Sequence, residues 1–424
     1  MTTLFIVTGL LTLLLCGIPV AFALLGFGLI LLVVGDFSIT LAPLGLFSSM
    51  DSFVLLAVPL FLLMSNILLE GKVGQDLFAA VQAWVGHWPG GLAVATVISC
   101  AIFAAISGSS VATAATVGTV AIPEMIERGY PRRFVLGLLA AGGTLGILIP
   151  PSIVLIIYGV ITESSVLKLF TAGIGPGLLI VGLFILYSVV YALRSQEYEP
   201  SEPAGWAIRK SATLRAGPTA ALALFVLAGI YRGWFTPTEA AAIGFAGAIF
   251  VTTVVLRSIT WPGFKAAIYR AMVTSVSILL IVAGAKVFGK AIALWRVPQN
   301  ISELISTNVH EPLAFIFVIA LVLLVVGLFL EALSMMLIMV PVLAGSLAVL
   351  GIDVIWFGIF FVIMIECALI TPPVGLNLFV IQSVGGASMR DVAMGVLPFL
   401  ILMLFAVLLI TISDAIVLFP VSLL

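Results

Sequence analysis

The sequence predicts an all-α polytopic membrane protein. The chain of 424 residues is 63% hydrophobic and only 8% charged, and its mean hydropathy is +1.37. Soluble domains carry about 25% charged residues, so this composition does not suit a water-soluble core. One membrane crossing needs roughly 20 apolar residues, which leaves room for about a dozen crossings or half-crossings. The lipid bilayer is therefore the expected partner, and no basic patch points to nucleic acid.

Two Pro-Pro pairs interrupt long apolar runs, Pro150-Pro151 and Pro372-Pro373, and they lie 222 residues apart. A proline inside a helix removes one backbone donor and clashes with the preceding turn. In a membrane such a break is tolerated only where the freed backbone faces protein, water or an ion. A paired break in two halves of a chain points to the binding site of a secondary transporter.

Polar residues divide the chain into apolar segments. These span 4–34, 52–70, 91–126, 134–161, 171–193, 217–233, 237–256, 272–295, 312–349, 354–382 and 392–418. The first has no basic n-region and no small-residue cleavage site, so we expect a retained membrane segment rather than a signal peptide. Residues 74–88 and 263–270 mix apolar and polar positions, which is typical of amphipathic helices at a membrane interface.

The two halves of the chain resemble each other in sequence. An offset of 222 residues relates the Pro-Pro pairs and matches Lys168 with Arg390, Gly173 with Gly395, and Pro176 with Pro398. An offset of 218 matches Pro123 with Pro341 and Gly71-Lys72 with Gly289-Lys290. So many matches at nearly one offset predict an internal repeat. Its units are residues 1–193 and 217–424, joined by a polar central loop, 194–216.

Segments 91–126 and 312–349 are too long for one crossing and awkward for two. Each has small or polar residues at its middle, from Ser107 to Ser110 in the first and from Gly327 to Glu331 in the second. This pattern predicts a re-entrant hairpin of two half-helices in each repeat. Two full crossings at each place are the alternative.

The basic residues predict the orientation of the chain. With both hairpins in place, 12 of the 17 basic residues fall in one set of loops. The positive-inside rule places these loops, the central loop and the N-terminus in the cytoplasm, and the C-terminus outside. The first hairpin then opens inward and the second outward, so the repeats are inverted. Full crossings would leave the loops on the same sides, so the charges do not decide the depth of the hairpins.

A cation site is predicted where the first hairpin tip meets the first helix break. Neither Pro150 nor Pro151 has an N–H, so carbonyls one turn earlier lack partners. Carbonyl and serine hydroxyl oxygens are hard ligands that suit Na⁺. The candidate ligands are Ser107, Ser109, Gly146, Ile149 and Pro151. The alternative is a packed proline kink in which the serine hydroxyls bond to carbonyls of their own helices.

The repeat predicts a second cation site in the second half. Its candidate ligands are Gly327 and Glu331 at the hairpin tip and Ala368, Thr371 and Pro373 at the break. Glu331 and Glu366 are intramembrane carboxylates, and such groups are functional candidates by default. The roles open to each are cation ligand, proton carrier and buried structural acceptor.

The half-helix N-termini at the tips and breaks suit a carboxylate substrate, because they carry partial positive charge and free N–H groups. The candidate substrate-binding side chains are Ser110, Thr113, Ser152, Asn377 and Lys286. Lys286 lies deep in its apolar segment, where it would pair with a buried carboxylate or meet an anionic substrate. Lys290 and Arg296 lie nearer the segment end and are expected to snorkel.

No enzymatic activity is expected. Neither His87 nor His310 has a Ser/Asp or metal-ligand neighbourhood, and no histidine in an apolar core segment can activate Ser107 or Ser109. The rival classes are an intramembrane enzyme with a glutamate base, at Glu331 or Glu366, and an ion channel.

Several motifs resemble the large membrane subunit of tripartite ATP-independent periplasmic (TRAP) transporters, a DctM-like family. They are GTLGILIPPS at 143–152, GYP at 129–131, FTPTEAAA at 235–242, GIPVA at 17–21 and TPPVG at 371–375. The resemblance covers essentially the whole chain. This chain differs from the family pattern at Glu331, where the second hairpin of such proteins often carries an aspartate, and at Lys286.

The resemblance implies a Na⁺-coupled importer of an organic acid: a C4-dicarboxylate, a keto acid or a sialic acid. It implies an elevator mechanism, with scaffold helices in 1–90 and 217–311 and transport parts in 91–193 and 312–424. It also implies Na⁺ at the tips and breaks named above, a small four-helix membrane subunit, a periplasmic substrate-binding protein, and a location in the bacterial inner membrane. The nearest alternative is a one-component carboxylate transporter of related fold, coupled to Na⁺ or H⁺.

Overall fold

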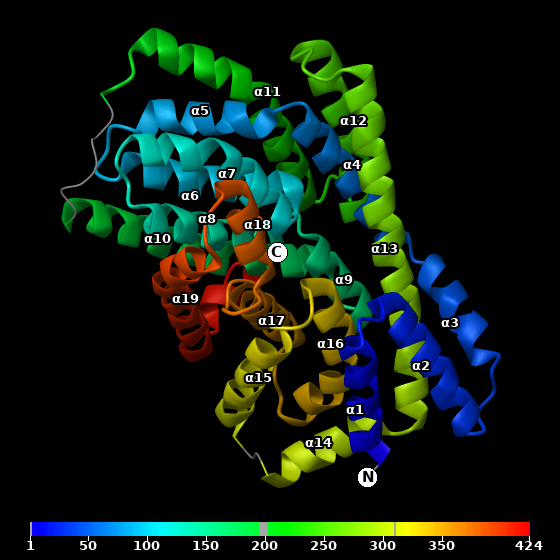
Figure 1. The fold of residues 1–424 in the computed structure, drawn as a ribbon. Helices are drawn as coiled ribbons and strands as arrows, with labels where there is room; N and C mark the ends of the chain where they lie inside the picture. The colour runs from blue at the N-terminus through cyan, green and yellow to red at the C-terminus, as the bar shows by residue number, and fades with distance from the viewer. Residues whose placement is uncertain (1, 195–201, 309–310) are drawn as a thin grey trace.

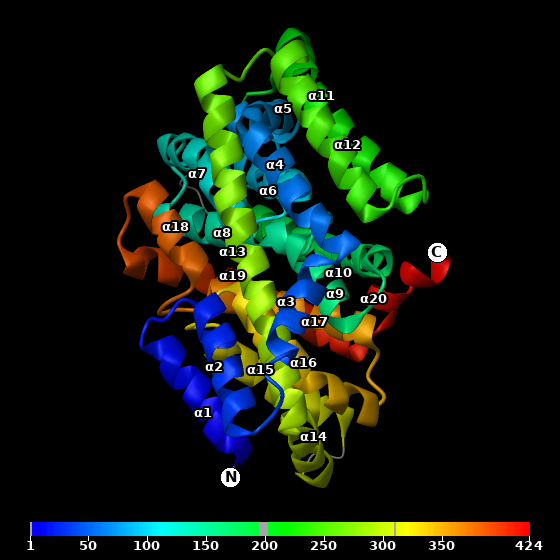
Figure 2. The same cartoon turned by 90° about the vertical axis from the view of Figure 1, so that its right-hand side faces the viewer.

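The computed structural model describes residues 2–194, 202–308 and 311–424, and every regular element in these ranges is a helix (Figures 1 and 2). The prediction of an all-α membrane fold is confirmed. Seven of the described helices are long and apolar enough to cross a membrane. Residues 195–201 of the predicted central loop, and His310, lie outside the described residues. Helix α11 begins at Trp206, so the last part of the segment predicted to be a loop is helical.

The first half follows the predicted segments, with additional short helices. Its elements are α1 (Thr2–Leu15), α2 (Val20–Val34), α3 (Leu41–Met50), η1 (Phe53–Leu56), α4 (Ala57–Glu70), α5 (Val73–Val85), α6 (Gly91–Ser107), α7 (Ser110–Glu127), α8 (Arg132–Thr144), η2 (Leu145–Ile147), α9 (Ile153–Thr162) and α10 (Val166–Arg194). The amphipathic segment predicted at 74–88 is α5. The long segment 91–126 divides into α6 and α7, as expected for a hairpin.

The second half repeats the order of elements that the first half shows from α5 onward. It contains α11 (Trp206–Tyr231), α12 (Pro237–Phe250), η3 (Val251–Val255), α13 (Trp261–Leu294), α14 (Val297–Asn308), α15 (Pro312–Val326), α16 (Ala332–Val349), α17 (Val354–Leu369), α18 (Leu376–Gly385), α19 (Met389–Ile412), α20 (Ala415–Leu418) and η4 (Val421–Leu423). A short helix, a hairpin, a broken helix and a long helix follow one another in α5–α10 and again in α14–α19. The Pro-Pro pairs lie in the two breaks, and both peptide bonds are cis.

Helix α13 runs down the right-hand part of the molecule in Figure 1 and down the middle of the view, in front, in Figure 2. Its 34 residues give a length of about 50 Å, and α2, α3 and α4 pack along it. Near its start Arg270 forms an ion pair with Glu70 at the end of α4. Residues 263–270 are the first turns of this helix, so the prediction of a separate interfacial helix there is wrong.

The N-terminal segment 4–34 is a hairpin of α1 and α2 rather than one crossing. Gly17 adopts a φ of +81° and Pro19 precedes α2, which turns the chain back on itself. Thr3 accepts a hydrogen bond of 3.0 Å from the Asn300 amide of α14. Because α14 follows the far end of α13, the N-terminus lies at the opposite end of the molecule from the Glu70–Arg270 pair and the basic loops near it (Figure 2). The prediction that the N-terminus lies with those loops is wrong.

The hairpins and broken helices of the two halves pack together in one core. Helix α7 packs on α18 and α16 on α9, while α8 packs on α19 and α10 on α17. At one end, Arg133 forms an ion pair of 2.8 Å with Asp391. There Arg132 also donates to the carbonyls of Gly385 and Gly386, at 2.8 Å each. Each hairpin therefore rests on the helix that follows the break of the other half.

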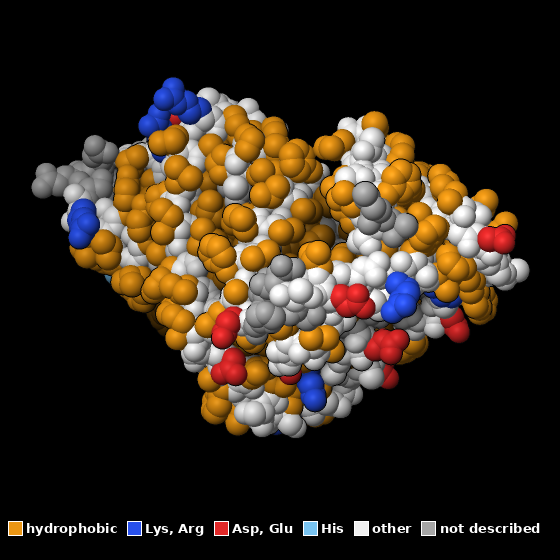
Figure 3. All heavy atoms as spheres, turned by 90° about the horizontal axis from the view of Figure 1, so that it is seen from below, with side chains coloured by type: hydrophobic (Ala, Val, Ile, Leu, Met, Phe, Trp, Pro, Cys, Tyr) orange, Lys and Arg blue, Asp and Glu red, His pale blue; other side chains and the backbone are white. Residues whose placement is uncertain are grey.

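The outer surface of the molecule is rich in large apolar side chains. Phe22, Phe225 and Phe250 are exposed to 58%, 47% and 58%, and Figure 3 shows hydrophobic side chains spread over much of one face. Soluble monomers rarely expose apolar patches of this extent. The surface therefore suits a lipid environment.

The crossing of α8 and α19 depends on glycine and generates a stability prediction. A Cβ added at Gly137 would overlap the carbonyl of Gly395. We expect Gly137→Ala to push the helices apart at a cost of about 1–3 kcal/mol, and so to lower the Tm of the purified protein in detergent. On α10, nothing lies within 4 Å of a methyl added at Gly182. Gly182→Ala should therefore keep or raise the Tm, and equal changes for the two variants would contradict the close packing.

Candidate functional site

The first hairpin tip is a tight turn between α6 and α7. Gly108 ends α6 with a φ of +59°, a left-handed conformation that glycine adopts at low cost. Ser109 is extended and caps α7, with its hydroxyl accepting from the Ala112 N–H at 3.4 Å. The run Ser-Gly-Ser-Ser thus ends one helix and starts the next, with only Gly108 and Ser109 between them.

Hydroxyl groups at this tip bond to one another. The Thr113 hydroxyl donates to the Ser109 carbonyl at 2.8 Å and lies 2.8 Å from the Ser107 hydroxyl. Both Ser107 and Thr113 are buried. Thr113 was predicted to bind substrate, but its hydroxyl points into the tip, so it belongs with the candidate cation ligands.

The first helix break lies between η2 and α9, around Pro150-Pro151. Ser152 caps α9 by accepting from the Leu155 N–H at 3.3 Å, and its hydroxyl donates to the Ile147 carbonyl. This side chain is completely buried, so the prediction that Ser152 contacts substrate does not fit its position. The carbonyls of Ile149 and Pro151 accept no hydrogen bond from any described residue. Both residues are among the candidate ligands named from the sequence, whereas the carbonyls one turn before the prolines are those of Gly146 and Ile147, and Ile147 is the one that accepts from Ser152.

The tip and the break are in direct contact. A Cβ added at Gly146 would lie 2.5 Å from the Ser109 carbonyl oxygen and 2.8 Å from the Thr113 hydroxyl. A Cβ added at Gly108 would lie 2.9 Å from the Pro151 carbonyl oxygen. Only glycine allows the two backbones to approach this closely. The structure therefore brings the residues of the first predicted cation site together.

The second tip and break also meet, with different chemistry. Gly327 follows α15, and a Cβ there would overlap the Ala368 side chain of α17. The Thr371 hydroxyl is already used, since it donates to the Cys367 carbonyl at 2.6 Å. The Pro373 side chain is exposed. Among the predicted ligands of the second site, Gly327 lies against Ala368, and the Thr371 N–H donates to the Ala368 carbonyl at 3.1 Å.

Glu331 precedes α16 and is exposed at the surface of a cavity. One carboxylate oxygen accepts from the Ser334 hydroxyl at 3.2 Å. Glu366 differs, because it is completely buried in α17 and neither of its oxygens has a hydrogen-bond partner among the described residues. Of the two intramembrane carboxylates, Glu331 is the one that a small molecule in the cavity can reach.

A cavity of about 230 Å³ lies between the two hairpin tips and α13. Its lining includes Gly108, Ser109 and Ser110 of the first tip, Glu331, Ala332 and Leu333 of the second, Ile153 and Val154 of α9, and Thr274, Ser277, Ile278 and Ile281 of α13. Among the predicted substrate-binding residues, Ser110 lines it. Thr274 and Ser277 were missed, although hydroxyl residues in an apolar segment are a usable sequence signal.

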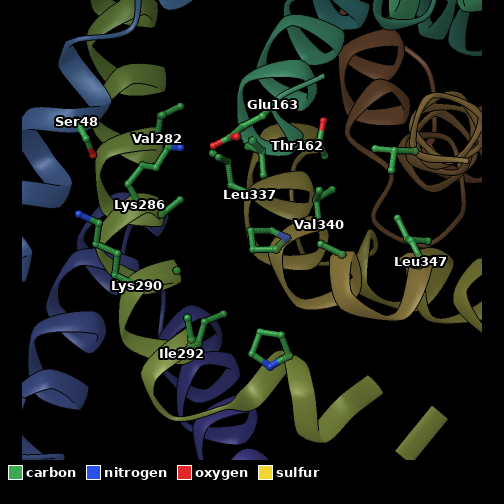
Figure 4. A pocket seen from close by; sticks show the side chains of 18 residues that line it. Ser48, Thr162, Glu163, Val282, Lys286, Lys290, Ile292, Leu337, Val340 and Leu347 are labelled. Atoms are coloured by element: carbon green, nitrogen blue, oxygen red, sulfur yellow. The ribbon is translucent and has the colours of Figure 1, made fainter. Parts of the chain in front are cut away.

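Two other predicted substrate-binding residues lie apart from this cavity. Asn377 is buried, and its amide donates to the Ala140 carbonyl at 3.3 Å, so it links α18 to α8. Lys286 lines a larger cavity of about 780 Å³ (Figure 4). Both cavities are bordered by α9, α13 and α16, with the larger one lying farther along α13 and α16 from the hairpin tips.

Comparisons with known proteins agree with this architecture. The family model described as "Tripartite ATP-independent periplasmic transporter, DctM component" matches residues 7–416. The C4-dicarboxylate TRAP transporter large permease protein DctM of Pseudomonas aeruginosa is 39% identical over 372 residues, covering 88% of this chain and 87% of the relative. The sialic acid TRAP transporter large permease protein SiaM of Vibrio cholerae is 32% identical over 394 residues, covering 93% and 92%. The solved YdaH transporter of Alcanivorax borkumensis has a similar fold, with a TM-score of 0.59 at 16% identity over 85% of each chain.

The contact between Gly146 and the first tip can be tested directly. We expect Gly146→Ala to separate the Ser109 carbonyl from the break and to abolish most of any rise in Tm that Na⁺ gives the purified protein, at constant ionic strength with K⁺. Gly118→Ala is the matched control, because its methyl on α7 meets only side-chain carbons, the nearest 3.3 Å away. An unchanged Na⁺ response in Gly146→Ala would rule out a cation site at this contact.

Proposed function

Because this chain belongs to the family of DctM components of tripartite ATP-independent periplasmic transporters, we propose that it is the subunit through which an organic acid crosses the bacterial inner membrane with Na⁺. Its relatives are named as transporter permease proteins, not as enzymes. The observation that carries the proposal is the contact of each hairpin tip with a helix break, beside a cavity that both tips line.

Coupling to Na⁺ is supported by the oxygen atoms at the first site. The carbonyls of Ile149 and Pro151 lack protein donors, and the Ser107 hydroxyl lies nearby at the tip that packs on this break. Unpaired carbonyls in a low-dielectric region are costly, and a hard monovalent cation would satisfy them without a carboxylate. The packed-kink alternative explains the serine hydroxyls but leaves these two carbonyls without partners.

An anionic substrate is supported by the N-termini of α7 and α16 at the small cavity. Each helix end stabilises a nearby anion by roughly 0.3–1 kcal/mol. Glu331 opposes this, because two unit negative charges 4 Å apart repel by about 4 kcal/mol at an effective dielectric of 20. A carboxylate therefore enters favourably only when a cation neutralises Glu331. This balance makes Na⁺ binding a condition for substrate binding.

The proposed substrate class is supported by relatives named for C4-dicarboxylates and sialic acid, and a C4-dicarboxylate is the first choice at 39% identity to its named transporter. We assign the basic loops to the cytoplasm. The N-terminus, which lies at the other end of the molecule, is then periplasmic, and for the C-terminus we keep the periplasmic location that the basic residues predict. An elevator movement would carry the core formed by α6–α10 and α15–α19 along α13.

A one-component carboxylate transporter is the second candidate, favoured by the YdaH-like fold. The two candidates differ in their partners. A TRAP large subunit works with a small membrane subunit and a periplasmic binding protein, whereas a one-component transporter needs neither. The intramembrane enzyme and the ion channel have no comparable support, because the relatives are named as transporter permease proteins and the described residues contain no group of three or more His, Cys, Asp or Glu side chains that could hold a metal ion.

The Na⁺ proposal predicts the effect of removing both tip hydroxyls. Ser107→Ala combined with Ser109→Ala should raise the Na⁺ concentration for half-maximal uptake about tenfold or more, because each lost polar contact is worth about 1 kcal/mol. The measurement is succinate uptake into proteoliposomes that contain the complete transporter. Ser188→Ala, whose buried hydroxyl bonds only to its own helix at Phe184, is the control. An unchanged Na⁺ affinity and rate in the double variant would remove this site.

The proposed assembly predicts that this chain alone does not transport. Proteoliposomes containing only this subunit should show no Na⁺-driven succinate uptake. Addition of the small membrane subunit and the binding protein encoded with it should restore uptake. Full uptake by the single chain would instead establish the one-component alternative.

A further inference from the structure

Two side chains of opposite charge face each other across the larger cavity. Lys286 extends from α13, and its ammonium group points into the open space (Figure 4). On the opposite wall, the Glu163 carboxylate points toward it from the end of α9 (Figure 4). Both residues line the same cavity of about 780 Å³. The basic group thus belongs to α13 and the acidic group to the end of α9, and the cavity lies between these two elements.

The surroundings make this pair of charges stand out. The facing wall formed by α16 is apolar, with Leu337, Val340 and Leu347 lining the cavity. Lys290 also borders the cavity, but its ammonium group points away from the open space (Figure 4). Neither Lys286 nor Glu163 takes part in any ion pair of 4.0 Å or less between described residues. Lys286 is therefore available to an anion in the cavity.

The backbone holds Glu163 at this position. It ends α9 in a left-handed conformation, with a φ of +54°, and its N–H donates to the Gly159 carbonyl. Because α9 begins at the Pro-Pro break, Glu163 is attached to the same core as the first predicted cation site. Lys286 is attached to α13, against which that core faces. A change in the spacing of these two elements changes the distance between the two charges.

We propose that Lys286 is an entry site that captures the carboxylate of the substrate, and that Glu163 is the competing anion on the opposite wall. The inference rests on the proposed function and extends it, because it assigns a role to Glu163 and a sequence of two sites. An incoming carboxylate first binds Lys286 in the large cavity, where it competes with the Glu163 carboxylate for the ammonium group. It then moves along α13 and α16 toward the small cavity at the hairpin tips.

The first test needs no transport assay. It measures how the local electrostatic potential at position 163 affects the reaction rates of charged thiol reagents. Glu163→Cys is placed in a Cys16→Ser background, since Cys16 is exposed while Cys100 and Cys367 are buried. The probes are an anionic sulfonate and a cationic trimethylammonium methanethiosulfonate. The anionic probe should react several-fold faster than the cationic one, and succinate should slow it. Lys286→Gln should abolish this preference, whereas Lys290→Gln should keep it; the same preference in both variants would overturn the proposal.

The second test measures uptake by the complete transporter. Lys286→Gln should raise the KM for succinate about tenfold, and Glu163→Gln should lower it, because the competing anion is gone. Lys290→Gln should leave the KM near the wild-type value. A change in the same direction for Glu163→Gln and Lys286→Gln would indicate a structural pair and reject competition. If the wild type takes up no succinate, the proposed function fails for this acid, and the thiol probes alone then decide whether Lys286 attracts anions.

Discussion

The structure depends on one constraint, which is that backbone carbonyls inside a membrane need partners. Pro150-Pro151 removes two N–H donors, and the Ile149 and Pro151 carbonyls remain without protein donors. The hydrocarbon layer of the membrane holds no water that could donate to these carbonyls instead. The break must therefore lie against a polar surface, and the Ser107 to Ser110 tip supplies it through the contact with Gly146. The hairpin and the glycine contacts follow from this requirement, and the two carbonyls that stay unpaired are the oxygen atoms that the proposed cation would satisfy.

The parts that sequence reasoning predicted are those set by local chemistry. Proline and glycine act on the backbone wherever they occur, so the breaks at the two Pro-Pro pairs and the turn at Gly108 could be located without a structure. The pairing of the first tip with the first break followed from the same logic and matches the Gly146–Ser109 contact. Repetition in the second half strengthened each inference, because a packing accident need not recur at an equivalent position.

The parts that were missed depend on which way a side chain points and which helix it meets. Thr113 and Ser152 have hydroxyls, but both turn toward backbone carbonyls within the tip or the break. Apolar length alone did not show the turn at Gly17, so segment 4–34 was predicted without its division into α1 and α2, and the N-terminus was placed with the basic loops. Thr274 and Ser277 border the small cavity only because α13 runs past both tips, a tertiary relation that periodicity does not contain.

The two tips have different chemistry, and this difference gives the two predicted cation sites different roles. The first tip offers only neutral oxygens, so an empty site there leaves unsatisfied dipoles but no net charge. The second tip presents Glu331 to the cavity, so under the proposed function an empty site there would leave a negative charge beside the substrate. That charge would oppose a carboxylate by more than the helix ends of α7 and α16 attract it, and occupancy of the second site would then decide whether an anion enters. The first site would hold the tip against the break, so the two sites would couple the anion to the cation gradient in different ways.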